Sequence, residues 1–409
     1  MILRLLLMLC LCGPGWAGEL ENRLRAGFSL LDSRYYSPVL RIWLDRHGDD
    51  LRGHFEGRIN PPWWSAANAV EGMVDAMNTL GTSEYETLLS RLHEMHREPA
   101  KRWPFVVAEL KRRGQWAADD ERQLGRRMKP RPVEGEFRNE YLDDSGWWGV
   151  AWMKLAERTG KAEYLQTAKA IHAHMAATWQ TDKGGGVLWC LDKDKQKTNA
   201  ITNNLFLILS ARLAKYTGEP SYREWAQRSC NWLKEQKLFD GTGVVDGPGH
   251  TGDYWSYNQG TYLAGLTAWS AASSDPALLD EAAAAARAIL QKAGFVTEQH
   301  ILREKLGTSG WDGCLFKGIL ARGLRELADA LRAAEKHPDL VQEIDQCLQA
   351  TAAAIMAGTP GDKEFPAEWH EGAANLETNY NTHLSALLAL TAALPPAPKM
   401  PASTSPQKQ

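Results

Sequence analysis

The sequence predicts an all-α fold, an (α/α)6 toroid, in which six helical hairpins close into a ring. Three observations predict this fold. A unit of two apolar helical runs joined by a short turn recurs along the chain, and the turns recur at a similar spacing. The helical runs at the two ends of the chain have no sequence neighbour to pair with. Pairing these ends would complete the sixth hairpin and close the ring.

The turns inside the hairpins share one pattern. The four turns are residues 80–85, 159–164, 217–222 and 273–278. In the first three, a glycine is followed four residues later by tyrosine, and in the fourth Ser274 and Leu278 take these places. A glycine here ends a helix in the left-handed conformation, and Pro220 and Pro276 suit the first turn of the next helix. Positions 81, 160, 218 and 274 are spaced for two helices of about four turns each plus connections.

The remaining helices follow from the same patterning. Residues 315–331 and 338–356 are predicted to form the fifth hairpin, and residues 20–31 and 378–394 the sixth. The interval between the first two turns is the longest. We therefore expect an insertion at residues 100–140, which are rich in proline and charge.

The two ends of the chain are predicted to lie outside the folded domain. Arg4, the apolar run 5–12 and the small residues Gly15 and Ala17 resemble a secretory signal cut near Ala17, which gives a signal segment 1–17. The run is too short to cross a bilayer, and no later segment has the apolar length of a membrane helix. We expect a secreted or periplasmic protein with one domain at 18–394. Residues 395–409, rich in Pro, Ser and Lys, are expected to be a disordered tail.

Composition argues against nucleic-acid binding and leaves other questions open. The chain has 409 residues, 47 basic and 50 acidic, so it lacks the positive charge typical of nucleic-acid binding. Seventeen tryptophans are many for this length. Flat indoles suit both a core and the apolar face of a sugar. The cysteines that would remain after signal cleavage are Cys190, Cys230, Cys314 and Cys347. Their spacing matches no zinc pattern, and disulfides and buried free thiols both stay open.

Polar and aromatic segments precede the predicted inner helices, so they would meet at one end of the ring. These segments are residues 62–65, 143–148, 199–204, 255–260, 310–317 and 379–383. The adjacent carboxylates Asp143 and Asp144 stand directly before an aromatic helical run. Such a pair can simply cap a helix. Among indoles and amides, however, it also suits acid–base chemistry on a glycosidic bond, which needs two carboxyl groups in different environments.

No competing constellation has comparable support. The chain has no Gly-x-Ser-x-Gly elbow, phosphate loop or His-Glu-x-x-His motif. His172 and His174 lie two apart on a predicted outer helix, so they cannot face one ligand. Residues 184–190 are predicted to form a short hairpin arm. Asp119 and Asp120, within the charged insertion, are expected to be solvated surface residues.

The run from residue 63 to 389 resembles glycoside hydrolase family 76, the endo-α-1,6-mannanases. The matching pieces are residues 64–68, 141–152, 184–189, 199–203, 243–246, 255–260 and 316–319. The resemblance implies an (α/α)6 catalytic domain that hydrolyses α-1,6-linked mannose with retention. It also implies Asp143 as nucleophile and Asp144 as general acid/base. Asn204 stands where the family often has Glu, and Lys183 where it often has Cys.

The expected substrate-binding residues combine these segments with the matching pieces. They are Trp63, Trp64, Asn68, Trp147, Trp148, Asn199, Asn203, Trp255, Tyr257, Asn258, Gln259, Asp312 and Lys317. The expected partner is an α-mannan oligo- or polysaccharide bound by a monomer, with no metal or cofactor. Retention requires two carboxyl groups about 5–5.5 Å apart. Asp143 should stay ionised, while its charged neighbour and nearby indoles raise the pKa of Asp144.

Several alternatives stay open at this point. The same residues could serve a transglycosylase. Another toroid enzyme acting on uronides, such as a hydrolase or lyase, or a sugar epimerase, would need a different charge or histidine pattern. A non-catalytic glycan-binding protein would keep the tryptophan walls without turnover. The choice of mannan, endo or exo action and a lipid anchor are likewise undetermined by the sequence.

Overall fold

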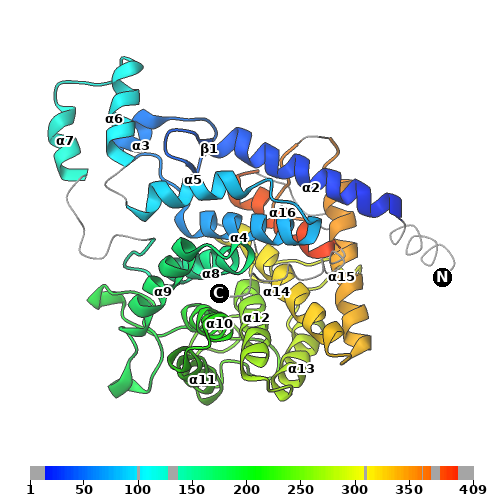
Figure 1. Cartoon of the computed structure of the whole chain (residues 1–409). Coiled ribbons are helices and arrows are strands. Elements are labelled where there is room, and N and C mark those ends of the chain that lie inside the picture. The colour runs from blue at the N-terminus through cyan, green and yellow to red at the C-terminus, as the bar shows by residue number, and fades with distance from the viewer. Residues whose placement is uncertain are drawn as a thin grey trace, which may run out of the picture.

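A computed structural model describes residues 14–98, 102–127, 137–307, 311–361, 363–369 and 378–394. The helices surround a common axis as a ring of hairpins (Figure 1). The predicted tail 395–409 and most of the predicted signal segment 1–17 lie outside the described residues. Among the described helices, none combines the length and apolar character needed to cross a bilayer.

Six inner helices form the wall around the axis. They are α4 (Trp63–Leu80), α8 (Leu142–Thr159), α10 (Ala200–Thr217), α12 (Ser256–Ser273), α14 (Gly313–Ala333) and α16 (Tyr380–Ala393). Each contacts the next, and α16 contacts α4, so the ring is closed. The backbones approach closely at Gly260 and Gly318. A Cβ added at either glycine would lie 2.5 Å from a carbonyl oxygen of the neighbouring helix.

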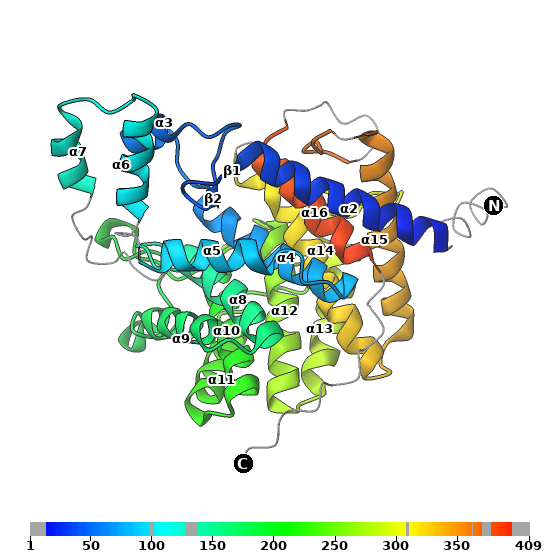
Figure 2. The ribbon, with the colours of Figure 1, turned by 45° about the horizontal axis from the view of Figure 1, so that its top comes forward.

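Six outer helices cover this wall. They are α5 (Glu86–Arg97), α9 (Ala162–Ala176), α11 (Pro220–Glu235), α13 (Ala277–Gln291), α15 (Pro338–Gly358) and α2 (Pro14–Tyr35). Helix α2 packs along α16, so the first and last described helices close the ring as predicted (Figures 1 and 2). The six-hairpin toroid is therefore confirmed.

The turns have the predicted geometry. Gly81, Gly160 and Gly218 are left-handed C-caps with φ of 64°, 69° and 72°, and Ser274 has φ of 59°. Pro220 begins α11, whereas Pro276 is the N-cap residue that precedes α13. The turn residues therefore act largely as the sequence indicates.

The insertions around the ring are short elements. They are β1 (Tyr36–Ser37) paired antiparallel with β2 (Ile42–Trp43), α3 (Leu51–Glu56), α6 (Arg102–Arg112), α7 (Asp120–Arg127) and the 3₁₀ turns η2 (Thr181–Lys183) and η3 (Lys193–Lys195). Helices α3, α6 and α7 stand to one side of the ring (Figure 2).

The expectation that Asp119 and Asp120 are both solvated is wrong for Asp120. Asp119 is exposed, but Asp120 is buried and pairs with Arg52 of α3 at 2.6 Å. It also accepts a hydrogen bond from the backbone of Ala117. A long arginine that reaches across from another helix neutralises this acid, and a local charge run cannot reveal such a partner.

The four cysteines among the described residues, Cys190, Cys230, Cys314 and Cys347, are buried free thiols, which decides between the two alternatives that the sequence left open. His172 is also buried, and its Nε2 lies 3.0 Å from Ser210 Oγ of the adjacent inner helix. This histidine therefore ties α9 to α10.

Candidate active site

A cavity of about 340 Å³ lies at the end of the ring where the inner helices begin. It is lined by Trp64, Tyr141, Asp143, Asp144, Trp147, Trp189, Lys197, Asn199, Asp246, Tyr257, Asp312 and Phe316. Most of these residues stand in the first turn of an inner helix or in the segment just before it. Five of the six predicted polar and aromatic segments therefore converge here, whereas no residue of 379–383 lines the cavity. Thr382 and His383 of that segment bond to the backbone of Phe365 and Gly27 instead.

Asp143 and Asp144 lie in the first turn of α8, after the extended N-cap residue Tyr141. Both are half-buried and line the same cavity. The Trp189 indole donates to Asp143 Oδ2 at 2.9 Å, and the Asp144 backbone N–H donates to Asp143 Oδ1 at 3.0 Å. Asn139 Nδ2 donates to Asp144 Oδ2 at 2.7 Å. Each carboxylate is thus held by its own donors.

The environments of the two carboxyl groups differ. Burial raises the pKa of Asp143 to about 6, and its hydrogen bonds from Trp189 and the Asp144 backbone oppose this rise. Burial raises the pKa of Asp144 well above its usual range, and the neighbouring Asp143 charge adds to the effect. One member of the pair is therefore the better base and the other the better acid, which is what acid–base chemistry requires.

Two further acids complete the lining. Asp246 accepts a hydrogen bond from Asn258 Nδ2 at 3.0 Å and from the Tyr257 hydroxyl at 3.3 Å. Asp312, just before α14, accepts from Trp64 Nε1 at 2.9 Å. Tyr257 stacks on Phe316 with ring centroids 4.1 Å apart. Carboxyl groups and aromatic faces together suit a ligand with hydroxyls and an apolar face.

One wall comes from the arm predicted at residues 184–190. Isolated bridges pair Trp179 with Val187, Leu188 with Thr198, and Cys190 with Tyr141. This pairing places the Trp189 ring against Tyr141, with centroids 5.3 Å apart. The arm is therefore part of the cavity.

Several predicted residues do not line the cavity because they hold the surrounding backbone. Asn203 bonds both backbone groups of Val187, and Gln259 bonds both backbone groups of Val244. Asn258 supports Asp246 from behind. First-turn amides of the inner helices thus fix the loops that carry the lining residues.

The other predicted residues outside the cavity lie in packed surroundings. Trp63 and Trp148 pack with Phe137, and Trp255 packs against Phe316. Asn68 accepts from Arg322 at 2.8 Å. Lys317 is fully buried and donates to the carbonyl of Ala367 beneath the Trp369 ring.

Sequence reasoning did not select Tyr141, Trp189, Lys197, Asp246 and Phe316. Trp189 and Asp246 each end a short segment that matches the family pattern, which was an available signal. Lys197 lies in an ordinary charged run, where sequence offered none.

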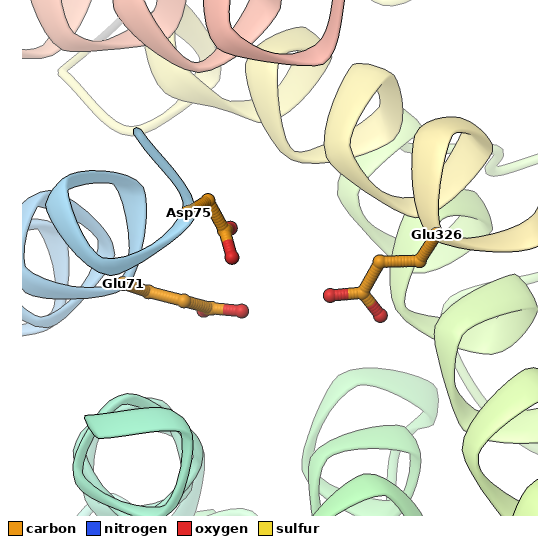
Figure 3. Close-up of side chains that lie close together, drawn as sticks. All are labelled: Glu71, Asp75 and Glu326. Atoms are coloured by element: carbon orange, nitrogen blue, oxygen red, sulfur yellow. The ribbon is translucent and has the colours of Figure 1, made fainter. Parts of the chain in front are cut away.

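One group of carboxylates among the described residues is close enough to hold a metal. Glu71, Asp75 and Glu326 point toward one another across the ring (Figure 3). The ammonium of Lys154 lies 3.1, 2.5 and 2.9 Å from their oxygens. A side-chain cation therefore already neutralises this cluster, which does not line the large cavity.

The chain is similar to several solved structures. The α-1,6-mannanase GH76A of Salegentibacter sp. HEL1_6 is 20% identical with a TM-score of 0.69, over 92% of this chain and 98% of that one. An inactive variant of that mannanase, with two consecutive aspartates replaced by asparagine, is known in complex with α-1,6-mannotriose. The Lin0763 protein of Listeria innocua has a TM-score of 0.68 and 20% identity, over 91% and 96% of the two chains. These likenesses support the fold.

Curated relatives are similar in sequence. The mannan endo-1,6-α-mannosidase DCW1 of Saccharomyces cerevisiae is 32% identical over 54% of this chain and 48% of its own length. The DCW1 protein of Candida glabrata is 32% identical over 30% of this chain and 32% of its own length. The chain therefore spans about half the length of these relatives or less. The model of glycosyl hydrolase family 76 matches residues 123–405, most of the chain. The chain therefore belongs to glycosyl hydrolase family 76.

Proposed function

We propose that this protein hydrolyses α-1,6-mannosidic bonds in mannan-type glycans with retention of configuration, as a secreted or periplasmic enzyme. The observation that carries the proposal is the pair Asp143 and Asp144, two carboxyl groups of unequal pKa in one cavity. Family membership and relatives named mannan endo-1,6-α-mannosidases support the substrate class. The inactive double-aspartate variant of the Salegentibacter mannanase supports the importance of an adjacent pair.

In the first step, Asp143 is the nucleophile and Asp144 the acid. Ionised Asp143 attacks the anomeric carbon, and the bond from that carbon to the glycosidic oxygen breaks as Asp144 protonates the oxygen. In the second step, Asp144 takes a proton from water. The water oxygen bonds to the anomeric carbon and Asp143 is released. Trp189 and the Asp144 backbone hold Asp143 for attack.

Replacement of each aspartate tests the proposal. On α-1,6-mannotetraose, Asp143→Asn and Asp144→Asn should each reduce kcat by roughly a hundredfold or more. With an α-mannosyl donor whose leaving group needs no proton, bond cleavage by Asp144→Asn should recover, while Asp143→Asn stays inactive. Asp119→Asn changes an exposed residue directly before α7 that does not line the cavity; it is the control and should keep wild-type turnover.

Product analysis distinguishes the related reactions. NMR of the first-formed product should show the α-anomer. A predominance of longer oligosaccharides at low acceptor concentration would favour transglycosylation over hydrolysis. Near-normal turnover of mannotetraose by Asp143→Asn would overturn the assignment of the nucleophile.

A further inference from the structure

Three lysines stand on the segment that leads to the cavity, and one of them lines it. Lys193, Lys195 and Lys197 alternate along the segment that leads from η3 toward α10. Lys197 lines the cavity, and it is the only basic side chain among its described lining residues. The other acid–base side chains of the lining are four aspartates and two tyrosines, so this ammonium is the one side chain there that suits an anion.

Lys197 has no carboxylate partner among the described residues. Its Nζ lies 4.9 Å from the centroid of the Trp189 ring, the indole that donates to Asp143. The side chain is exposed, so its N–H donors face solvent at the cavity. A cation over an indole keeps these donors available to a ligand.

Lys195 is placed in a similar way on the neighbouring aromatic residue. Its Nζ donates to the Tyr141 hydroxyl at 2.8 Å and lies 5.3 Å from the ring centroid. The nearest acid paired with it, Asp192, is 3.9 Å away. Two ammonium groups therefore flank the aromatic wall formed by Tyr141 and Trp189. In the part of the chain that the structure describes, their one acidic contact is the 3.9 Å approach of Asp192 to Lys195.

This placement favours an anion at the cavity edge. Recognition of a neutral mannose uses hydroxyl partners such as Asn199 and Asp246, which the lining already supplies. A lysine ammonium is a strongly hydrated point charge and a common phosphate ligand. The cavity acids would repel an anion near Asp143, whereas the lysine side of the wall would attract it.

We propose that Lys197, assisted by Lys195, binds a phosphate group carried by a mannose next to the cleaved bond. The preferred substrate would then be a phosphorylated α-1,6-mannan. This inference rests on the proposed function and adds the chemical class of the substrate.

The test compares two matched substrates. One is α-1,6-mannotetraose. The other is the same sugar with one phosphate monoester on a terminal mannose, prepared as two isomers that carry the phosphate at the reducing or the non-reducing end. The measured quantity is the ratio of kcat/KM for the phosphorylated to the neutral substrate. In the wild type this ratio should be about three- to tenfold for at least one isomer, since exposed charge pairs contribute modestly. It should fall as NaCl is raised.

Substitutions assign the preference to a residue. Lys197→Met keeps an unbranched stem on Trp189 but removes the charge, and it should bring the ratio close to one. Lys195→Met should reduce the ratio partly. Lys193→Met is the matched control, because Lys193 is exposed on the same segment and does not line the cavity. It should keep the wild-type ratio.

The outcomes separate this proposal from the proposed function. A wild-type ratio of one or less for both isomers, or an unchanged ratio in Lys197→Met, overturns phosphate recognition. If neither substrate is cleaved, the proposed function fails. In that case, calorimetric titration of Asp143→Asn with both sugars still tests phosphate recognition. Tighter binding of the phosphorylated sugar supports the proposal if the difference disappears in Asp143→Asn/Lys197→Met. A terminal uronic acid and a methyl phosphodiester distinguish carboxylate, monoester and diester recognition; stronger preference for the uronic acid contradicts a phosphate site.

Discussion

At the scale of single residues, two adjacent aspartates acquire different chemistry from their donors. Asp143 accepts from an indole and a backbone N–H, whereas Asp144 accepts from one side-chain amide and lies beside a like charge. Their titrations are coupled, so the apparent pKa values from a measured pH profile will belong to the pair as a whole.

The unequal environments predict a bell-shaped dependence of kcat/KM on pH. Turnover should rise as pH increases through about 6, because Asp143 must lose its proton, and it should fall at higher pH as Asp144 loses its own. Trp189→Phe removes a donor that lowers the pKa of Asp143, so the acid limb should move to higher pH by roughly one unit.

The control for this pH profile is Trp43→Phe. It removes an indole donor at 2.8 Å from Asp32, which does not line the cavity. Its acid limb should match the wild type. An unmoved acid limb in Trp189→Phe would contradict the role given to the Trp189 hydrogen bond.

Sequence reasoning identified the acidic pair as a candidate but could not sort the amides. Asn199 lines the cavity, whereas Asn203, one helical turn later, bonds the backbone of Val187. Both stand in the same segment, and only the packed arm determines which one faces the ligand. Asp246 was missed although its segment matches the family pattern, because its hydrogen bonds from Tyr257 and Asn258 form only once the connecting loop is folded.

At the scale of elements, the arm at residues 184–190 depends on glycine. Gly185 and Gly186 have φ of 87° and 86°, and a Cβ on either would lie under 3 Å from the buried Trp232 ring. Gly184 has φ of 85° but open space around its Cβ position. Close packing and backbone conformation together set the position of Trp189.

These glycines give a matched pair of substitutions. Gly184→Ala should cost about 1 kcal/mol of unfolding free energy from its backbone conformation alone. Gly186→Ala should cost roughly 1–3 kcal/mol more, because Trp232 must move. It should also raise KM by displacing Trp189. Urea unfolding with kinetics on α-1,6-mannotetraose measures both effects, and equal costs at the two positions would contradict the packing argument.

The hairpins were predictable because each signal is local. Left-handed caps such as Gly160 and apolar runs of helical length depend on the segment itself. Asp120 was not predictable, since its burial depends on Arg52, which lies 68 positions earlier in the chain.

At the scale of the whole molecule, one cluster links four inner helices, α4, α8, α10 and α14. Lys154 of α8 pairs with Glu71 and Asp75 of α4 and with Glu326 of α14. Arg322 pairs with Glu71 at 3.0 Å, and Arg212 with Glu326 at 3.3 Å. Buried charges of this kind are stable only as a complete set.

Lys154→Met should therefore lower the free energy of unfolding at pH 7 by about 3–5 kcal/mol. The loss should shrink as pH falls, because protonation of the stranded carboxylates removes their buried charge. Lys169→Met breaks an exposed pair with Glu219 and should cost less than about 1 kcal/mol. Urea unfolding at pH 7 and pH 5 measures these differences, and a cost for Lys154→Met as small as that of the control would contradict the cluster's role.

The closed ring itself was predictable from the unpaired ends, because α2 and α16 each needed an apolar partner. The charged centre was not, since Glu71, Lys154 and Glu326 look like ordinary surface residues in sequence. Only closure of the ring turns these helix positions inward.

The separation of the inner helices from the connections that border the cavity has an evolutionary consequence. Among the described residues, five inner helices place their starting turn, or the residue just before it, at the cavity, whereas cross-ring contacts such as those of Lys154 lie farther along the helices. A connection such as the exposed segment 192–196 can therefore lengthen, shorten or change its charge without disturbing the scaffold. Preference for a new glycan can arise by altering one connection at a time, while the aspartate pair on α8 stays in place.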